Sequence, residues 1–521
     1  MNQYHLKRQE NALDTYVLYN TERIPQKYCG RKTDTEIIFE TKLNRAFFLT
    51  KLMVPGFGGA YLFADNLGKG YAPDGELLDF CLEAARSRKF HLEAFLKQVQ
   101  DECKMIPKNS LDRMETAGRF ILEGKALESL RELLWAGEEL VEFWSRCRIA
   151  KRGRRKNFLL GCSTKGFTGS SEKWKELFGS LFNAVCIPTH WGVLEPERGE
   201  THYEVLNEMV SWCRTKQMNI RGHAVVWFCS LWEKQNWMGR LSYEEVRRLC
   251  LARVEMLMER YGSDFDCIDF NEPMQSNGLN MTFDEHFAIV REAYDVVKRH
   301  NPKCRIMINF FNEWQEFYGL DREETLKEHY AVTGLKASEY EWSVTVYDYI
   351  DRCLREGMVI DYLGLQWHDH PYDLFGSYQL IRQWYDRYGI PVQITELEVA
   401  SGTGRPLFTI GRRPNPAPQL YWHEPWSEAV QAEWFEKYLL LAYSMEEVEA
   451  FCVFGFCEAP TQWGNYVEGK GIAEWFKVSA CAYSCLLDEN FRPKASYYIL
   501  KRMARELGIL REKGSDSRET H

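Results

Sequence analysis

Long apolar segments are missing from this sequence, and so is an excess of basic residues. No run approaches the roughly 20 apolar residues that a membrane-spanning helix needs, and the start, MNQYHLKRQENALDTY, lacks the apolar part of a secretory signal. Lys and Arg number 66 against 75 Asp and Glu, which gives a net charge of -9. A general nucleic-acid-binding protein needs a strongly basic face. We therefore expect neither a membrane nor a nucleic acid as a partner, and we interpret the basic run at 151–156 as a solvated joint.

Cysteine is not scarce, but the pattern of a disulfide framework is missing. The 16 cysteines are scattered through expected strands and helices, which favours free thiols in a reducing compartment. The spacing within the closest group fits a zinc ribbon poorly, and buried thiols are the favoured interpretation for its members, Cys452, Cys457, Cys481 and Cys485. We expect no metal, no cofactor and a cytoplasmic location.

The length of 521 residues suits a (β/α)8 TIM barrel with one or two smaller pieces. Residues 1–75 have the alternation and β-branched content of a small β-rich domain, which we interpret as a structural appendage rather than a sugar-binding module. Residues 76–156 show the three- and four-residue apolar spacing of helices and form a helical connector. Residues 157–510 form the expected barrel, and 511–521 a disordered tail.

Strands and helices alternate throughout residues 157–510, which predicts parallel βα units. Eight short apolar strand candidates occur there: FLLGCST, NAVCIPTHW, NIRGHAVVW, DCIDFNEP, CRIMINFF, YLGLQWHDH, VQITELEV and AFCVFGF. The stretch 401–427 is long, rich in Pro and Gly, and without helical spacing. We expect this loop to cover the active-site face, with Trp422 and Trp426 as an aromatic wall that limits access to the cleft.

Two glutamates stand at the carboxyl ends of strand candidates, which is the edge where TIM-barrel enzymes carry their active sites. Glu272 ends the fourth candidate and Glu396 the seventh. A buried carboxylate is costly unless it is paired or used. Taken singly, each glutamate could form a salt bridge or a helix cap. Together with Asn271 and His368 on the same edge, they match the pair of carboxyl groups that glycoside hydrolysis needs.

Further motifs in the same order resemble family 10 of the glycoside hydrolases, the xylanase family. The family's Asn-Glu strand end is similar to IDFNEP, its Thr-Glu-Leu-Asp motif to ITELEV, its RGH-x-x-x-W strand to RGHAVVW, and its Gln-x-His end to GLQWHDH. Asn309 begins a fifth-strand Asn-x-x-Asn, FGFCEAPTQW resembles the last strand, and LLDENFRPKASY resembles the family's ending. The resemblance covers about 157–510, and residues 1–150 are similar to leaders of a divergent branch.

The resemblance implies a role for each matching residue. Glu272 would be the general acid/base and Glu396 the nucleophile. Asn271 would bind the sugar 2-hydroxyl, His368 would keep the nucleophile ionised, and Glu398 would fix the tautomer of His368. The substrate-binding candidates are His223, Trp227, Gln366, Asn309, Trp463, His190, Trp191 and Phe454.

The sequence departs from the family pattern mainly on the second strand. The usual Glu-Asn-x-x-Lys-Trp run is replaced by CIPTHW, in which Trp191 is kept and His190 stands in the place of the Lys. Phe228, Phe454 and Cys267 replace a His and two Trp elsewhere. These changes predict that the subsite for the reacting sugar is kept and that the outer subsite is rebuilt.

The function implied by the resemblance is a retaining β-glycoside hydrolase, of the endo-1,4-β-xylanase type, that acts on plant-type oligosaccharides by double displacement. Three alternatives stay open. The first is an inactive sugar-binding protein on the same fold, and the second is a transglycosidase. The third is a metal-dependent hydrolase using His368-x-His370, which is disfavoured because such enzymes place this motif on the first strand.

Overall fold

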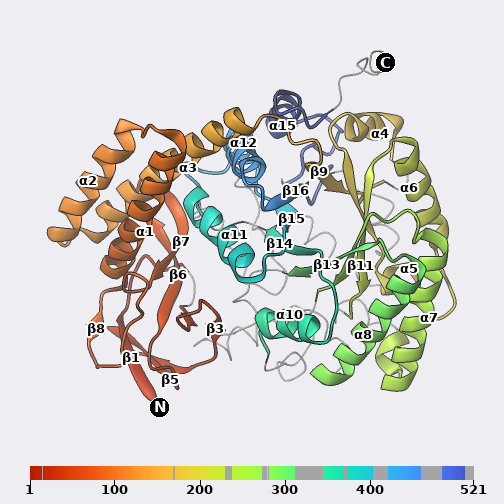
Figure 1. Cartoon of the computed structure of the whole chain (residues 1–521), viewed down its shortest axis with the longest axis horizontal. Coiled ribbons are helices and arrows are strands. Elements are labelled where there is room, and N and C mark those ends of the chain that lie inside the picture. Colours follow the sequence, from red (N-terminus) through yellow and green to blue (C-terminus); the bar gives the residue numbers. More distant parts are fainter. Residues whose placement is uncertain are drawn as a thin grey trace.

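The computed structural model places an amino-terminal region of strands and helices beside a barrel (Figure 1). The structure describes residues 1–13, 16–167, 170–228, 237–272, 279, 281–310, 344–368, 370, 372–402, 421–458 and 484–510. The candidates Trp463 and the tail 511–521 lie outside these residues, as does the middle of the 401–427 loop. None of the described helices is long and apolar enough to cross a membrane.

The first strands form two four-stranded sheets. One has the order β4-β5-β1-β8 and the other the order β3-β2-β6-β7. Apolar and aromatic side chains of β6 and β7 are almost continuously buried, which explains why the sequence pattern there alternates only in part. The strands are β1 (Asn2–Lys7), β2 (Val17–Tyr19), β3 (Pro25–Gln26), β4 (Cys29–Lys32), β5 (Glu36–Thr41), β6 (Phe47–Val54), β7 (Gly58–Ala64) and β8 (Leu77–Leu78).

Three helices connect these sheets to the barrel: α1 (Phe80–Cys103), α2 (Lys108–Leu122) and α3 (Ala126–Arg152). Asp79 caps α1 by accepting a hydrogen bond from the backbone N–H of Leu82. The basic run at 151–156 overlaps the end of α3, and four of its six residues are exposed as expected, whereas Arg152 and Arg155 are half-buried. Arg152 donates to the carbonyl of Ser444 (3.0 Å) and Arg155 to that of Met445 (2.8 Å). These carbonyls lie at the carboxyl end of a barrel helix, where positively charged groups are favoured.

Eight parallel strands close the barrel in the order β10-β11-β12-β13-β14-β15-β16-β9, which confirms the predicted (β/α)8 fold. The strands are β9 (Leu159–Ser163), β10 (Ala184–Pro188), β11 (Asn219–Val226), β12 (Cys267–Asn271), β13 (Arg305–Phe310), β14 (Tyr362–His368), β15 (Val392–Glu398) and β16 (Val448–Val453). Seven of the eight strand candidates contain one of these strands, and the eighth, AFCVFGF, begins two residues after the start of β16. Almost all of their residues are buried, as expected for a sheet covered on both faces.

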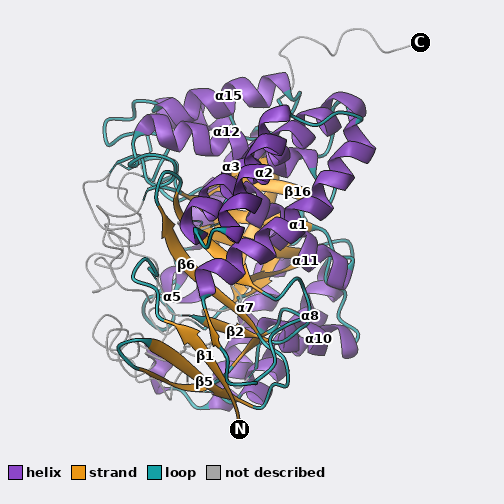
Figure 2. Ribbon diagram, turned by 90° about the vertical axis from the view of Figure 1, so that its left-hand side faces the viewer, coloured by secondary structure: helices purple, strands orange, loops and turns teal. Residues whose placement is uncertain are grey.

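Helices surround the strands, and both views show them outside the sheet (Figures 1 and 2). They are α4 (Glu172–Gly179), α5 (Trp191–Leu194), α6 (Tyr203–Thr215), α7 (Tyr243–Tyr261), α8 (Phe283–His300), α10 (Val346–Arg355), α11 (Leu374–Tyr388), α12 (Glu428–Ser444) and α15 (Ala495–Glu506), with a short 3-10 helix at Trp237–Arg240. The described cysteines are free thiols, and Cys452 and Cys485 are buried.

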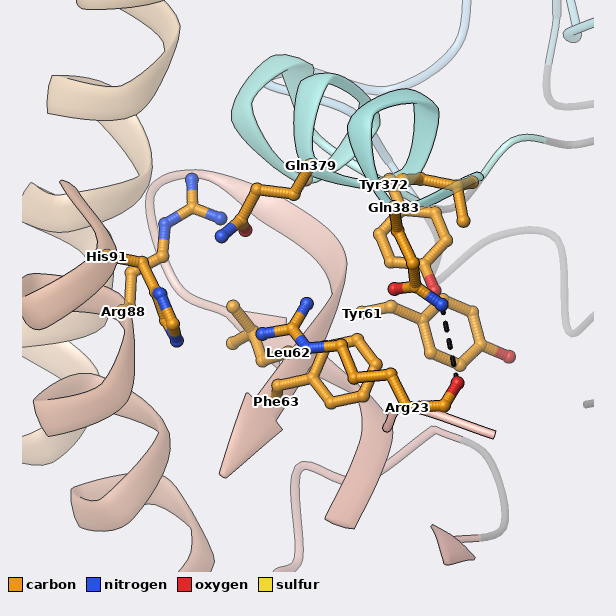
Figure 3. Close-up of a pocket in the computed structure, with 11 residues that line it drawn as sticks. Arg23, Tyr61, Leu62, Phe63, Arg88, His91, Tyr372, Gln379 and Gln383 are labelled. Atoms are coloured by element: carbon orange, nitrogen blue, oxygen red, sulfur yellow. Dashed lines mark hydrogen bonds between the residues drawn. The ribbon is translucent and has the colours of Figure 1, made fainter. Parts of the chain in front are cut away.

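The amino-terminal helices pack directly against α11 and α12 of the barrel. Arg88 of α1 donates to both carboxylate oxygens of Asp373, and both side chains are almost fully buried. Phe95 packs against Phe375 and Tyr378 at ring distances of 5.3 and 4.7 Å. A cavity of about 30 Å³ remains between β7, α1 and α11 (Figure 3), which is room for about two water molecules. The two regions therefore share one continuous core.

A second contact joins the β6–β7 hairpin to the end of the 401–427 loop. The backbone N–H of Gly59 donates to the carbonyl of Tyr421 (3.0 Å), and that of His423 donates to the carbonyl of Phe57 (2.7 Å). A Cβ at Gly58 would lie 2.3 Å from that same Tyr421 oxygen, so only glycine fits there. Trp422 is 5% exposed and stacks on His423. The expectation that Trp422 forms an aromatic wall of the cleft was wrong, because its ring is buried against Trp426 and Tyr438.

Candidate active site

The two glutamates predicted from the sequence meet at the carboxyl edge of the barrel. Glu272 directly follows β12 and Glu396 lies near the end of β15, with two strands between them in the barrel order. Both are buried, with 4% and 5% of their surface exposed. One carboxylate oxygen of each lies within 4.8 Å of the other. Two acidic groups at such a distance in a buried place cannot both ionise freely.

Glu396 is surrounded by hydrogen-bond donors. The Nε2 of His368 lies 2.9 Å from Oε2 of Glu396, and the Nδ1 of His368 lies 2.6 Å from Oε1 of Glu398. Asn309 and Gln366 donate to the other oxygen of Glu396 at 3.3 and 3.4 Å. Burial acts to raise the pKa of Glu396, but the His368 hydrogen bond and nearby positive charges lower it to about 2. Glu396 is therefore ionised at neutral pH.

His368 is the main source of this effect because it lies between two carboxylates. Burial acts to lower the pKa of His368, but the charge of Glu398 and the hydrogen bonds to both glutamates raise it to about 9. The imidazole is therefore protonated at neutral pH and donates from both nitrogens. The positions of Glu398 and His368 are those that the resemblance implied.

The pKa of Glu272 is shifted in the opposite direction from that of Glu396. Burial raises its pKa well above the ordinary range, and the charges of Glu396 and Asp269 raise it further. His223 lies between the two glutamates, with Nδ1 3.6 Å from Glu272 and Nε2 3.5 Å from Glu396. At neutral pH the site therefore holds one protonated and one ionised glutamate, which is the distribution that an acid and a nucleophile need.

Asp269 belongs to this site and was missed in the sequence. It is fully buried, accepts from His223 at 2.6 Å and from Asn309 at 2.7 Å, and lies within 4.8 Å of both glutamates. Asp269 and Asn271 are two residues apart on β12, but the register of the strand shifts between them. Simple alternation therefore does not relate their side chains, and the partners of Asp269 lie on other strands.

Asn271 is fully buried and bound by protein groups. Its amide nitrogen donates to the carbonyl of Val226, and its oxygen accepts from the hydroxyl of Tyr349 at 2.9 Å. Tyr349, on α10, was not identified from the sequence. These contacts fix the amide beside Glu272, and its contact with a sugar 2-hydroxyl stays a prediction.

The remaining substrate-binding candidates on the second and third strands differ in whether they face the site. His190 lies 5.1 Å from His223 and 5.0 Å from Trp227 between ring centroids, so all three line the same side of the site. Burial holds the pKa of His190 well below its ordinary range, and the charges of His223 and Lys165 lower it further. Trp191 instead contacts Glu195 at 2.9 Å and Trp237.

Phe454 stands with its ring edge-on to His368, at a centroid distance of 4.8 Å. Phe454 directly follows β16, which is next to β9 in the barrel order, and it forms a second wall of the site. Trp463 was expected beyond it, but that position lies outside the described residues.

The described part of the site also contains a set of side chains that could hold a metal ion: His223, Asp269, Glu272 and Glu396. The motif His368-x-His370 does not contribute to this set. His370 lies 2.7 Å from the hydroxyl of Ser377 and stacks flat on Trp367, whereas His368 binds the two glutamates. The metal-dependent alternative therefore has no two-histidine site at that motif.

Residues 153–503 match the sequence model of glycosyl hydrolase family 10. The chain belongs to glycosyl hydrolase family 10. This match confirms the family that the motifs suggested, over nearly the same residues.

Similar proteins carry the name xylanase. This family 10 chain is 22% identical over 259 residues to endo-1,4-beta-xylanase 2 of Arabidopsis thaliana, a match that covers 48% of this chain and 22% of the plant protein. It is 21% identical over 348 residues to endo-1,4-beta-xylanase B of Thermotoga neapolitana, covering 64% of this chain and 84% of that one. Native xylanase 10B of Thermotoga maritima is similar in structure, with a TM-score of 0.47 and 19% identity over 68% of this chain and 97% of that chain.

Proposed function

We propose that this family 10 protein is a retaining β-glycoside hydrolase that cleaves short, β-linked, plant-type oligosaccharides. The observation that carries the proposal is the pair of buried glutamates, Glu272 and Glu396, with oxygens within 4.8 Å and opposite pKa shifts. Retaining enzymes hold their carboxyl groups about 5–5.5 Å apart, whereas inverting ones leave about 6.5–9.5 Å for a water molecule. The short separation supports retention.

In the first step the Glu396 carboxylate attacks the anomeric carbon while Glu272 gives its proton to the leaving oxygen. The glycosidic C–O bond breaks, and an ester forms between the sugar and Glu396. This ester removes the charge of Glu396, which is one of the charges that raise the pKa of Glu272. Glu272 is thus prepared to act as a base.

In the second step the Glu272 carboxylate takes a proton from water, and the resulting hydroxide attacks the anomeric carbon. The ester bond breaks and Glu396 leaves as a carboxylate. The protonated His368, with the Asn309 and Gln366 amides, stabilises that returning charge. Two inversions give net retention.

The substrate class follows from the family and from the names of the similar proteins, which are endo-1,4-beta-xylanases. Xylan-derived or related β-linked oligosaccharides are therefore the first choice. The neutral His190 on the rebuilt second strand supports a changed neighbouring subsite.

The experiment that tests this function is a screen of aryl-β-glycosides and plant-wall oligosaccharides, with Glu396→Ala as the blank and a chelator arm. The proposal expects chelator-independent hydrolysis with a β-configured first product by NMR. Binding without turnover would indicate the inactive sugar-binding protein, and longer products would indicate a transglycosidase. Loss of activity on chelation would indicate a metal at the four-residue set.

The opposite pKa shifts predict a bell-shaped pH profile of kcat/KM. Glu396 must be ionised, so its lowered pKa sets the acidic limb, and activity falls below it. Glu272 must be protonated, so its raised pKa sets the basic limb, and activity falls above it. In Glu272→Ala, assayed on an activated aryl glycoside, the basic limb is expected to disappear. A basic limb that is unchanged in this variant would contradict the assignment.

We also propose that the protein works in the cytoplasm on imported oligosaccharides. Free thiols at the described cysteines, many of them buried, support a reducing compartment. Long polysaccharides do not cross membranes, so kcat/KM is expected to reach its maximum on short chains. Values that rise steadily with polymer length, or recovery of the native protein outside the cell, would contradict this.

A further inference from the structure

Lys165 reaches the candidate site from a strand that contributes no predicted catalytic residue. It lies in the turn two residues after the end of β9, and its backbone N–H donates to the hydroxyl of Ser163. β9 lies between β10 and β16 in the barrel. The turn therefore stands between the wall formed by His190 and the wall formed by Phe454.

The side chain of Lys165 is directed toward the nucleophile side of the site. Its Nζ lies 3.8 Å from the centroid of the Phe454 ring, which is a close cation–π contact. Phe454 in turn meets His368 edge-on, and His368 binds Glu396. Lys165 as a whole is half-buried.

Charged groups surround Lys165. Burial lowers the pKa of Lys165 below its ordinary value, and the negative charges of Glu396, Glu398 and Glu272 offset part of that effect. In return, its positive charge lowers the pKa of both Glu396 and Glu272. The titratable and charged groups around it are Glu396, Glu398, Glu272, Cys186, His190 and, through Phe454, His368.

We propose that Lys165 is a specificity-determining residue, whose ammonium group on Phe454 donates hydrogen bonds to hydroxyls of the sugar that Glu396 attacks. An ammonium group carries three donors, and a sugar ring offers acceptors in every direction. The inference deepens the proposed function and rests on it, since it assigns the sugar to the Phe454 side of the cleft.

Two consequences can be measured. Hydrogen bonds to a charged group are stronger than those between neutral groups, so Lys165→Met is expected to weaken binding of the sugar roughly ten- to a hundredfold. The same variant removes a positive charge near both glutamates, so both limbs of the pH profile of kcat/KM should move to higher pH. Lys165→Arg keeps the charge, and its limbs should stay near those of the wild type.

A matched control is Lys175, which lies 4.9 Å over the ring of Phe167 and pairs with Glu172 and Glu208 away from the site. Lys175→Met loses a similar cation–π contact and should leave both limbs unchanged. Equal effects of the two Met variants would mean that the loss at Lys165 is general destabilisation, and would overturn the proposal.

Binding of xylobiose to Glu396→Ala, measured by calorimetry with and without Lys165→Met, separates this inference from the function itself. Weaker binding in the double variant supports Lys165 even if the wild type shows no turnover, in which case only the hydrolase proposal fails. Unchanged binding and unchanged pH limbs in an active enzyme would overturn the role of Lys165 alone. Absence of xylobiose binding to Glu396→Ala would overturn both for this sugar class.

Discussion

Replacement of Glu396 with glycine is expected to lower kcat on an aryl-β-glycoside by roughly 10⁴-fold or more, because the covalent route loses its nucleophile. Azide should restore part of the activity, since it fits the space that the side chain leaves and attacks from the same face. The product would then be the α-glycosyl azide, which NMR and mass spectrometry identify.

The matched control is Glu398→Gly, which removes a carboxylate two residues away on the same strand. Glu398 binds His368 at 2.6 Å but is not the predicted attacking group, so its loss should reduce activity without azide rescue. A β-configured azide from the Glu396 variant would mean that the roles of Glu396 and Glu272 are exchanged. Activity of Glu396→Gly near that of the wild type, measured without azide, would contradict the mechanism.

The second large effect is expected from Arg88→Ala. Arg88 and Asp373 form an ion pair with side chains 5% and 0% exposed. Removing one partner of a buried pair leaves the other charge uncompensated, at a cost of about 3–5 kcal/mol. Asp373 also caps α11 through the N–H groups of Phe375 and Gly376. Urea unfolding should show a large drop in the free energy of unfolding, or a separate early transition.

Arg86→Ala is the control on the same helix. Its side chain is 49% exposed and pairs with Glu83, and such surface pairs contribute about 0–1 kcal/mol. A double replacement, Arg88→Leu with Asp373→Leu, removes both charges and should recover part of the stability lost in Arg88→Ala. If Arg88→Ala and Arg86→Ala shifted the urea midpoint equally, the pair would not stabilise the junction.

The barrel and the two glutamates could be predicted because both depend on local patterns. Each strand is a short apolar run, and each functional group follows its strand at the edge where TIM barrels place their chemistry. His368 and Glu398 were found in the same way, as neighbours at the ends of consecutive strands.

Other parts of the site depend on contacts between distant residues, which a single sequence does not reveal. Asp269 acquires its role only because β11 and β13 bring His223 and Asn309 to it. Lys165 lies in a turn with no periodic signal. Trp422 looked like a free aromatic residue in a polar loop, but its ring is buried against Tyr438 of α12.

The backbone contact between Gly59 and Tyr421 also bears on where this protein can be divided. The family match begins at residue 153, directly after α3. A fragment cut there would keep every catalytic candidate, yet it would expose Phe375 and Tyr378, which Phe95 of the first region contacts. It would also remove the backbone hydrogen bond from Gly59 to Tyr421, which lies shortly before α12. In this chain the segment that matches the family is therefore smaller than the segment that shares one core, and a fragment beginning at residue 153 is expected to be less stable than the whole chain.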